Sequence, residues 1–247
     1  MIDVVRNDRV ARLAINAPPV NVLDRAVLDE LTGRLRELGE QEDLAAVLIE
    51  GAGRCFSAGA SVAEHQPEQA PEMVAALTRA CVALAELPVP AVAMVHGSCL
   101  GGAMELVSFC DFVVADPDAT LGQPEIKLAF FPPLACHQLP RLTGLQNAAY
   151  VVLTGEGLSA EQAAAMGLVQ RVLDKDRWTE IDEIFNGLSA AALRMTKKAL
   201  RVGAGAHDAA RLKALEDLFL TDLYGLEDVA EGISSFQERR RPSWKHR

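Results

Sequence analysis

The sequence has little of several features that assign a protein to a class at once. Aromatic residues make up only 5% of its 247 positions, and 24 cations are outnumbered by 34 anions, for a net charge of −10. Generic affinity for nucleic acid comes mostly from clustered Lys and Arg that meet phosphates. We therefore expect no nucleic-acid partner, and an anionic ligand would need a local basic pocket.

Cysteine pairs are also missing. The five cysteines are odd in number, lie in apolar surroundings and show no paired metal-ligand spacing. This pattern predicts reduced, mostly buried thiols in a cytoplasmic protein, with no metal site.

Long hydrophobic runs are absent as well. The apolar stretches at 92–95 and 190–193 are short, whereas a membrane-spanning helix needs roughly 20 consecutive apolar residues. The first eight residues carry acids early and lack the basic and apolar regions of an export signal. The sequence therefore predicts no membrane span and no export.

The chain is half apolar, which suits one large globular domain or one domain with an appendage. Segments typical of strands alternate with helical ones, a pattern that predicts an α/β fold with partly parallel sheets. The predicted strands are 10–15, 45–49, 91–95, 112–115 and 169–173. The predicted helices run from Asp24 to about 40, over 71–86, from the segment 96–102 onward, from Ser159 to 166, and almost continuously over 178–240 with an interruption at Gly203 and Gly205. We divide the chain near residue 175 into a core (1–175) and a helical carboxy-terminal region (176–247).

The first segment that could carry chemistry runs from Cys55 to Ser61, directly after a predicted buried strand. Its small residues permit close approach of a ligand, and Gly59 can adopt backbone angles closed to other residues. Neighbouring amides can then point outward toward an anion. An ordinary turn explains the same residues, so both interpretations stay open for this segment alone.

The second segment, from Gly101 to Glu105, places two glycines at a strand-to-helix junction. The first amides of a helix have no partner within it and can bind an oxyanion. If the amides of Ala60 and Gly102 converge on one carbonyl oxygen, they would stabilise an enolate. A dinucleotide-binding loop, as in an oxidoreductase, requires the spacing Gly-x-Gly-x-x-Gly, which is absent here.

Two acids complete the pattern. Glu105 lies one turn into that helix among apolar neighbours, and Glu125 follows Pro124 in the segment 121–126. Either glutamate alone would pass as a solvated side chain. As a pair they suit hydration, because one carboxylate can take a proton from water while the other, protonated, gives one to carbon. The sequence leaves open which of the two is protonated.

These segments resemble the crotonase, or enoyl-CoA hydratase, superfamily, and the resemblance covers nearly the whole chain, from about 21 to 240. It implies a spiral of strand-strand-helix (ββα) turns, a helical carboxy-terminal region, and assembly into homotrimers or into hexamers that are dimers of trimers. It implies an acyl-CoA thioester as the substrate, with coenzyme A as part of that substrate and no separate cofactor. The tail around Phe236 and 239–245 would lie near a coenzyme A site.

The resemblance also assigns roles to single residues. It makes the amides of Ala60 and Gly102 the oxyanion hole and makes Glu105 and Glu125 the catalytic acids. The turn near Ala58 would receive the adenine of coenzyme A. The residues expected to bind substrate or coenzyme A are Ser57, Ala58, Gly59, Ser61, Gly101, Phe131 and Pro132.

Two departures from the family pattern bear on the substrate. Typical enoyl-CoA hydratases have Asp at the position of Ser61 and a glycine-rich stretch where this chain has the aromatic and proline residues of 130–136. That stiff wall, together with 56–62 and 123–128, is similar to superfamily members that hydrate cyclohexa-1,5-diene-1-carbonyl-CoA by 1,4-addition. We therefore expect hydration of an α,β-unsaturated acyl-CoA, with a ring-shaped dienoyl group as the narrower expectation.

Other functions stay open at this point. A double-bond isomerase or an acyl-CoA decarboxylase needs the same enolate-stabilising amides, and an acyl-CoA binding protein could keep the fold without turnover. The presence of both acids favours the hydratase, which is a lyase. We expect structural roles for His65, His96 and His137, which lack the spacing of a zinc triad. Lys197 and Lys198 could approach a phosphate or could merely favour the helix dipole.

Overall fold

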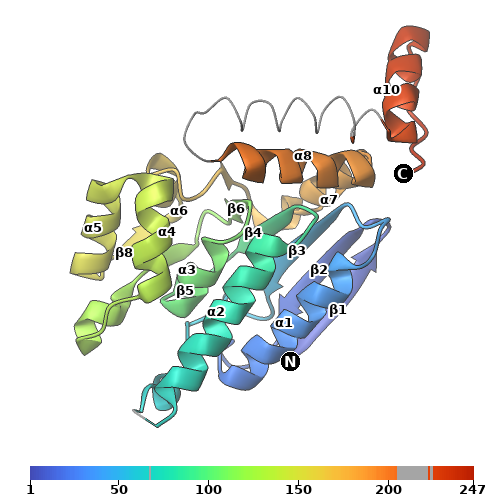
Figure 1. Cartoon of the computed structure of the whole chain (residues 1–247). Helices are drawn as coiled ribbons and strands as arrows, with labels where there is room; N and C mark the ends of the chain where they lie inside the picture. The colour runs from blue at the N-terminus through green and yellow to red at the C-terminus, as the bar shows by residue number, and fades with distance from the viewer. Residues whose placement is uncertain (67, 205–221, 223–224) are drawn as a thin grey trace.

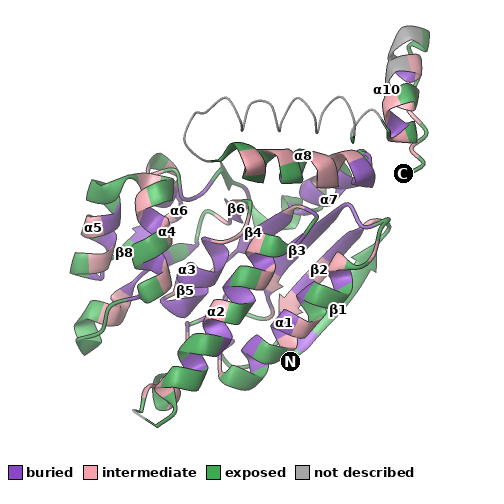
Figure 2. Ribbon diagram, in the orientation of Figure 1, coloured by how far each residue is buried: buried purple, intermediate pink, exposed green. Residues whose placement is uncertain are grey.

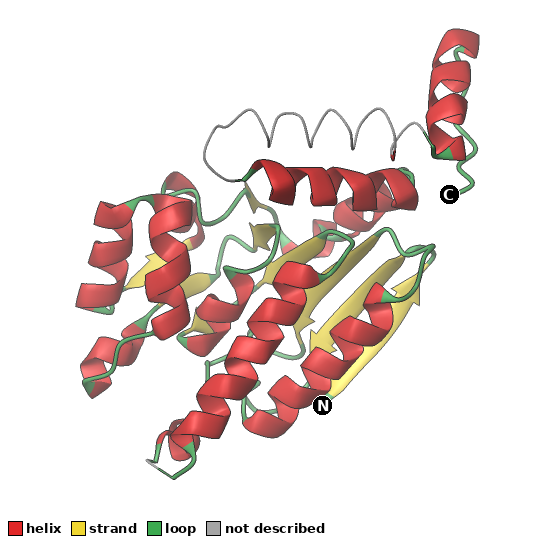
Figure 3. Cartoon of the chain, in the orientation of Figure 1, coloured by secondary structure: helices red, strands yellow, loops and turns green. Residues whose placement is uncertain are grey.

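The computed structural model describes residues 1–66, 68–204, 222 and 225–247, and it contains two sheets with helices packed around them (Figures 1 and 3). The strands are β1 (Ile2–Asn7), β2 (Val10–Ile15), β3 (Ala46–Gly51), β4 (Ala91–Val95), β5 (Ser98–Leu100), β6 (Phe112–Ala115), β7 (Thr120–Gly122), β8 (Gly157–Ser159) and β9 (Arg171–Val172). The α-helices are α1 (Arg25–Gly39), α2 (Ala70–Glu86), α3 (Gly102–Val107), α4 (Pro133–Thr143), α5 (Leu145–Thr154), α6 (Ala160–Ala165), α7 (Thr179–Asn186), α8 (Ala190–Gly203) and α10 (Glu227–Glu238). Three short 3₁₀ helices are η1 (Val62–His65), η2 (Pro124–Leu128) and η3 (Lys175–Arg177).

The larger sheet has the strand order β1-β2-β3-β4-β6-β9. Only β1 and β2 run antiparallel, and the remaining neighbours are parallel. The smaller sheet has the order β5-β7-β8, in which β5 and β7 are parallel and β7 and β8 antiparallel.

The chain path is a spiral in which each turn visits both sheets before entering a helix. β4 leads to β5 and then α3, and β6 leads to β7 and then η2. In the earlier turns, single parallel bridges take the place of a second strand: Ser57 pairs with Cys99, and Leu23 pairs with Ala60. This arrangement confirms the predicted α/β spiral of ββα turns.

The two faces of the larger sheet pack into two separate hydrophobic clusters. Along β3, Val47 and Ile49 pack in the cluster that includes α1 and α2, while Leu48 packs with Trp178 and α7 on the other face. This alternation follows from the two-residue period of a strand. Because both faces of the central strands are covered, β4 is apolar throughout and β3 is apolar from Ala46 to Ile49, and both stretches are buried (Figure 2).

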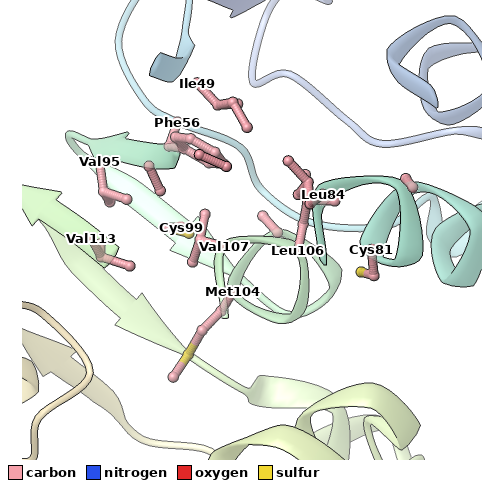
Figure 4. Close-up of a cluster of buried hydrophobic side chains, with 14 of the residues drawn as sticks. Ile49, Phe56, Cys81, Leu84, Val95, Cys99, Met104, Leu106, Val107 and Val113 are labelled. Atoms are coloured by element: carbon pink, nitrogen blue, oxygen red, sulfur yellow. The ribbon is translucent and has the colours of Figure 1, made fainter. Parts of the chain in front are cut away.

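Helix α3 is wholly buried between the sheets and α2, and this fixes the elements of the site. Its side chains Met104, Leu106 and Val107 lie among Phe56, Val95 and other apolar residues from both sheets (Figure 4). Every residue of α3 is buried. Gly102 and Glu105, which belong to the same helix, are therefore held in place by the core.

Several local predictions are confirmed. Asp24 caps α1 by accepting a hydrogen bond from the Val27 amide at 2.8 Å. Ser159 and Gln162 form a capping box at α6, and Gly167 follows its end with φ of 84°. Two strands differ from the prediction: β1 was not predicted, and the segment 96–102, predicted to open a helix directly, first forms the short strand β5. β5 has only three residues, too few for a strand period to be visible.

The carboxy-terminal region begins against the sheet. Trp178, Ile181 and Phe185 pack on β2, β3, β4 and β6. The helical stretch predicted for 178–240 is interrupted at 187–189, where Ser189 caps α8 by accepting a hydrogen bond from the Ala192 amide. α8 ends at Gly203 as predicted, whereas Gly205 lies outside the described residues. α10 stands apart from both sheets (Figure 1), and the division near 175 stays a prediction.

No helix in the described part of the chain is both long and apolar enough to cross a membrane.

Candidate active site

A cavity of about 480 Å³ opens where the first two loops of the spiral meet η2 and the start of α4. Its wall is mainly apolar. It includes the backbone of both loops and both predicted catalytic acids. The residues that line it are Ala58, Gly59, Ala60, Val62, His65, Ala70, Met73, Val74, Leu77, Gly101, Gly102, Glu105, Pro124, Glu125, Lys127, Leu128, Phe130, Phe131, Pro132, Pro133 and Leu134.

The amide of Ala60 is directed away from the chain segment beside it. In the parallel bridge between Leu23 and Ala60, the Leu23 amide donates to the Gly59 carbonyl at 2.9 Å and the Ser61 amide donates to the Leu23 carbonyl at 3.2 Å. In such a bridge the hydrogen-bonding groups of the middle residue point to the opposite side. Ser57 steadies this loop, because its hydroxyl accepts from the Gly59 amide at 3.0 Å and donates to the Asn21 carbonyl at 2.6 Å.

The start of α3 brings a second amide beside that of Ala60. A β-carbon at Gly102 would stand 3.2 Å from the Ala60 nitrogen and 3.0 Å from its β-carbon, so the two backbones touch. Gly101, which precedes the helix, has φ of 53°. Among the hydrogen bonds of the described residues, neither the Ala60 nor the Gly102 amide has an acceptor. Two free donors side by side in a cavity are the geometry of an oxyanion hole.

Glu105 is buried, with 3% of its surface exposed, and is held from one side. Its Oε1 accepts hydrogen bonds from the amides of Leu134 and Ala135, at 2.8 and 2.9 Å, in the first turn of α4. Burial raises the pKa of Glu105, while the two amides and the nearby His65 oppose that rise. The amide donors stabilise the carboxylate, which suits Glu105 to the role of base.

Glu125 lies in η2 across the cavity and has a different environment. Burial raises its pKa to about 7, its own backbone amide opposes that rise, and the charge of Glu105 adds to it. In the amide orientation that pairs donor with acceptor, the buried Gln123 donates to Glu125 at 3.0 and 3.1 Å. Burial thus raises the pKa of both carboxyls, but only Glu105 accepts hydrogen bonds from two amides of α4, and such different surroundings are typical of an acid and a base that act together.

The aromatic and proline wall lies where α4 begins. Phe130 and Phe131 are 47% and 68% exposed, whereas Pro132 is buried, and all three line the cavity. Proline at the first position of α4 fixes the backbone without losing a helical hydrogen bond. The wall is thus a rigid turn with open aromatic faces at the cavity mouth.

Sequence comparison assigns this arrangement to a family. The profile described as enoyl-CoA hydratase/isomerase matches residues 5–247. The chain belongs to the enoyl-CoA hydratase/isomerase family.

Relatives of this family cover the chain almost completely. It is 33% identical over 248 residues to cyclohexa-1,5-dienecarbonyl-CoA hydratase of Thauera aromatica, covering 98% of this chain and 95% of that protein. A "Probable enoyl-CoA hydratase" of Mycobacterium tuberculosis is 34% identical over 253 residues, covering 99% and 97%. The crystal structure of enoyl-CoA hydratase from Bacillus anthracis matches with a TM-score of 0.93 at 30% identity, covering 100% and 99%. The similar identities to differently named hydratases support the family and leave the acyl group undecided.

Most of the residues expected from the crotonase resemblance meet in one cavity of this family member. Glu105, Glu125, Ala60 and Gly102 line it, together with Ala58, Gly59, Gly101, Phe131 and Pro132. Ser57 and Ser61 do not line it. Both are buried behind the first loop, where Ser57 holds the turn and Ser61 precedes η1.

Other residues have positions that the sequence did not show. His65, expected to be structural, lines the cavity. His96 and His137 do not line it: the His96 ring contacts that of Trp178, and His137 is exposed on α4. Lys197 is buried and paired with Asp111 at 2.5 Å, so the structure contradicts the suggestion that it approaches a phosphate.

The remaining assignments concern the tail and metals. The side chain of Phe236 lies outside the described residues. Arg240 forms ion pairs with Glu231 and Glu238 within the carboxy-terminal region. Across the described part of the chain, no three His, Cys, Asp or Glu side chains converge as a metal site would require.

Proposed function

We propose that this protein is a hydratase that adds water across the double bond of an α,β-unsaturated acyl-CoA thioester. The observation that carries the proposal is the position of Glu105 and Glu125 in one cavity, beside the Ala60 and Gly102 amides, which have no acceptor within the described residues. Family membership supports the same reaction, because several relatives are named as hydratases.

In the proposed reaction the thioester carbonyl oxygen accepts hydrogen bonds from the Ala60 and Gly102 amides. These donors stabilise the negative charge that develops on this oxygen as an enolate forms, and loss of one such donor costs about 3–4 kcal/mol of transition-state stabilisation. The apolar cavity wall strengthens both bonds, since water does not screen them.

The two glutamates handle the protons of the reacting water. Glu105, held as a carboxylate by the Leu134 and Ala135 amides, takes a proton as the water oxygen bonds to the β-carbon. Glu125, protonated because burial raises its pKa to about 7, gives its proton to carbon and so quenches the enolate. Transfer of a proton from Glu105 back to Glu125 restores the starting state, and coenzyme A leaves as part of the product.

The narrower substrate that we propose is cyclohexa-1,5-diene-1-carbonyl-CoA. The open aromatic faces of Phe130 and Phe131 suit a flat ring, and the Thauera relative bears a name of this kind. For this dienoyl group, the 1,4-addition delivers the proton to the far end of the conjugated system, while the same amides hold the dienolate.

We also propose that the chain assembles into a homotrimer or a dimer of trimers in the cytoplasm. The exposed apolar side chains of α5, Leu145, Tyr150 and Leu153, offer a surface for subunit contacts. Sedimentation equilibrium would give the subunit number, and a monomer at micromolar concentration would contradict this assembly.

One experiment tests both reaction and substrate. The protein is incubated in ¹⁸O-labelled water with crotonyl-CoA and, separately, with the cyclic dienoyl-CoA, while the absorbance of the conjugated thioester is followed. We expect loss of absorbance and one labelled oxygen in the product. Migration of the double bond without label would indicate an isomerase, and absence of turnover on every enoyl-CoA would favour a binding protein.

A further inference from the structure

His65 is a polar side chain in a mainly apolar cavity, and the two proton transfers do not use it. It ends η1, directly after the first loop, and lines the same cavity as Glu105 and Glu125. A few placed polar groups in an apolar pocket usually orient a ligand. The His65 ring could therefore bind a ligand in this cavity if one of its nitrogens is free to form a hydrogen bond.

The Nδ1 atom of His65 is occupied. It lies 2.8 Å from the Ser61 carbonyl oxygen, which can only accept a hydrogen bond, so Nδ1 carries a hydrogen and donates it. In the neutral ring, Nε2 then has a lone pair that can accept a hydrogen bond. Among the described residues, no donor lies within hydrogen-bonding distance of Nε2.

A contact with Phe130 also orients the His65 ring. Its centroid lies 5.3 Å from that of Phe130, with the planes inclined at 56°, so His65 joins the first loop to the aromatic wall. His65 also lines the same cavity as Glu105. Two contacts thus hold His65 in the cavity that also contains Glu105, the proposed base.

We propose that His65 Nε2 accepts a hydrogen bond from the hydroxyl group that hydration places on the acyl chain, which makes His65 a specificity-determining residue for hydroxyacyl-CoA. This inference rests on the proposed function. Before addition, the hydrogens of water are handled by Glu105. After addition, the product keeps one hydroxyl hydrogen, and a buried donor without an acceptor is costly. His65 supplies that acceptor.

The test compares thioesters that differ only in the hydroxyl. Binding of butyryl-CoA and of each enantiomer of 3-hydroxybutyryl-CoA is measured by calorimetry. We expect the wild type to bind one hydroxy enantiomer roughly threefold to tenfold more tightly than butyryl-CoA, the range of one net hydrogen bond. A role of His65 that is only structural would change both affinities equally.

Two substitutions distinguish the roles of Nδ1 and Nε2 of His65. His65→Asn retains a donor at the position of Nδ1, which can still bond the Ser61 carbonyl, but has no group at Nε2, and we expect it to lose the preference for the hydroxyl. His65→Gln reaches as far as Nε2 with a carbonyl oxygen and should retain part of the preference. His137→Asn, an exposed histidine outside the cavity, is the matched control and should behave as wild type.

Persistence of the full preference in His65→Asn would overturn the inference, as would its absence in the wild type. His65→Phe, which keeps a ring against Phe130, covers the case in which the Asn variant unfolds. The two proposals fail separately. A wild type that shows the preference but incorporates no labelled oxygen contradicts hydration alone, whereas a wild type that hydrates without the preference contradicts only the role of His65.

Discussion

The carboxyl of Glu125 lies over Gly101, so close that a β-carbon at residue 101 would stand 2.7 Å from Glu125 Oε1. Gly101 also has φ of 53°, in the region that favours glycine. We expect Gly101→Ala to displace the carboxyl and to lower kcat at least about tenfold, since a misplacement of about 1 Å can cost about a hundredfold. Steady-state hydration of crotonyl-CoA or of the cyclic dienoyl-CoA, whichever the wild type turns over faster, measures this change in kcat.

Gly33 is the matched glycine for that experiment. It lies inside α1, where an added β-carbon would meet nothing within 4 Å. Gly33→Ala should leave kcat unchanged and stabilise the fold by about 0.5–1 kcal/mol, because alanine is the better helix former. A Gly101→Ala enzyme with wild-type kcat would show that the contact with Glu125 does not position the acid.

Replacement of Glu125 by Gln removes the proton donor while keeping the size of the side chain. We expect turnover to fall at least about a hundredfold, the low end for a general acid, with little change in the affinity for coenzyme A thioesters. Glu183→Gln, on the exposed face of α7, is the control. Undiminished turnover in the Glu125 variant would exclude that residue as the acid.

The pH dependence of activity follows from the same carboxyl. Glu125 must hold its proton to act as the acid, and its pKa is about 7. The value of kcat/KM should therefore decline as pH rises through about 7, and decline again at low pH as Glu105 is protonated. Because the two carboxyls interact, the limbs report the pair. A profile that is flat between pH 6 and 9 would contradict the assignment.

Stability should depend on pH in a related way. Since the pKa of Glu125 in the folded chain, about 7, lies above the ordinary value of 4.5, the folded state binds the proton more tightly than the unfolded state. This contribution is present below about pH 4.5 and is lost as pH rises through about 7. The Gln side chain does not titrate, so the free energy of unfolding of Glu125→Gln relative to wild type should rise by roughly 1–3 kcal/mol from pH 5 to pH 8, allowing for solvent screening. Urea unfolding of both proteins at pH 5 and pH 8 measures this difference. The same difference at both pH values would argue against a raised pKa of Glu125.

Lys197 should matter for the fold and not for coenzyme A. It is buried, donates to the Val89 carbonyl at 2.8 Å and pairs with Asp111. Lys197→Ala should lower the free energy of unfolding by about 2–4 kcal/mol, because it leaves polar partners unpaired, with KM for acyl-CoA unchanged. Lys198→Ala, which removes an exposed ion pair with Asp222, should cost under about 1 kcal/mol. A raised KM for acyl-CoA in the Lys197 variant would instead indicate that Lys197 contacts a phosphate of coenzyme A.

The sequence predicts elements whose signals are local. Asp24 and the Ser159–Gln162 box mark helix starts through contacts three residues apart, and buried strands such as β4 are continuous apolar runs. β1 was missed because only Ile2 of its six residues is buried, so it lacks an apolar period.

The site shows the same limit. Glu105, Glu125 and the two amides could be predicted because family resemblance connects segments that are distant in sequence. The role of His65 in lining the cavity depends on η1 turning toward Phe130, and the donors to Glu105 come from Leu134 and Ala135, nearly thirty positions away. Backbone amides leave no mark in residue types, so no local pattern could reveal these contacts.

The amides that bind Glu105 follow the aromatic and proline wall directly in the sequence: residues 130–133 line the cavity, and the amides of 134 and 135 donate to the Glu105 carboxylate. Under the proposed function, one short segment therefore both shapes the acyl pocket and positions the base. We expect that remodelling the wall to admit a bulkier acyl chain would also shift the start of α4, and with it the Glu105 carboxylate that its amides hold. Changes of acyl specificity in this chain should accordingly require compensating substitutions in α4.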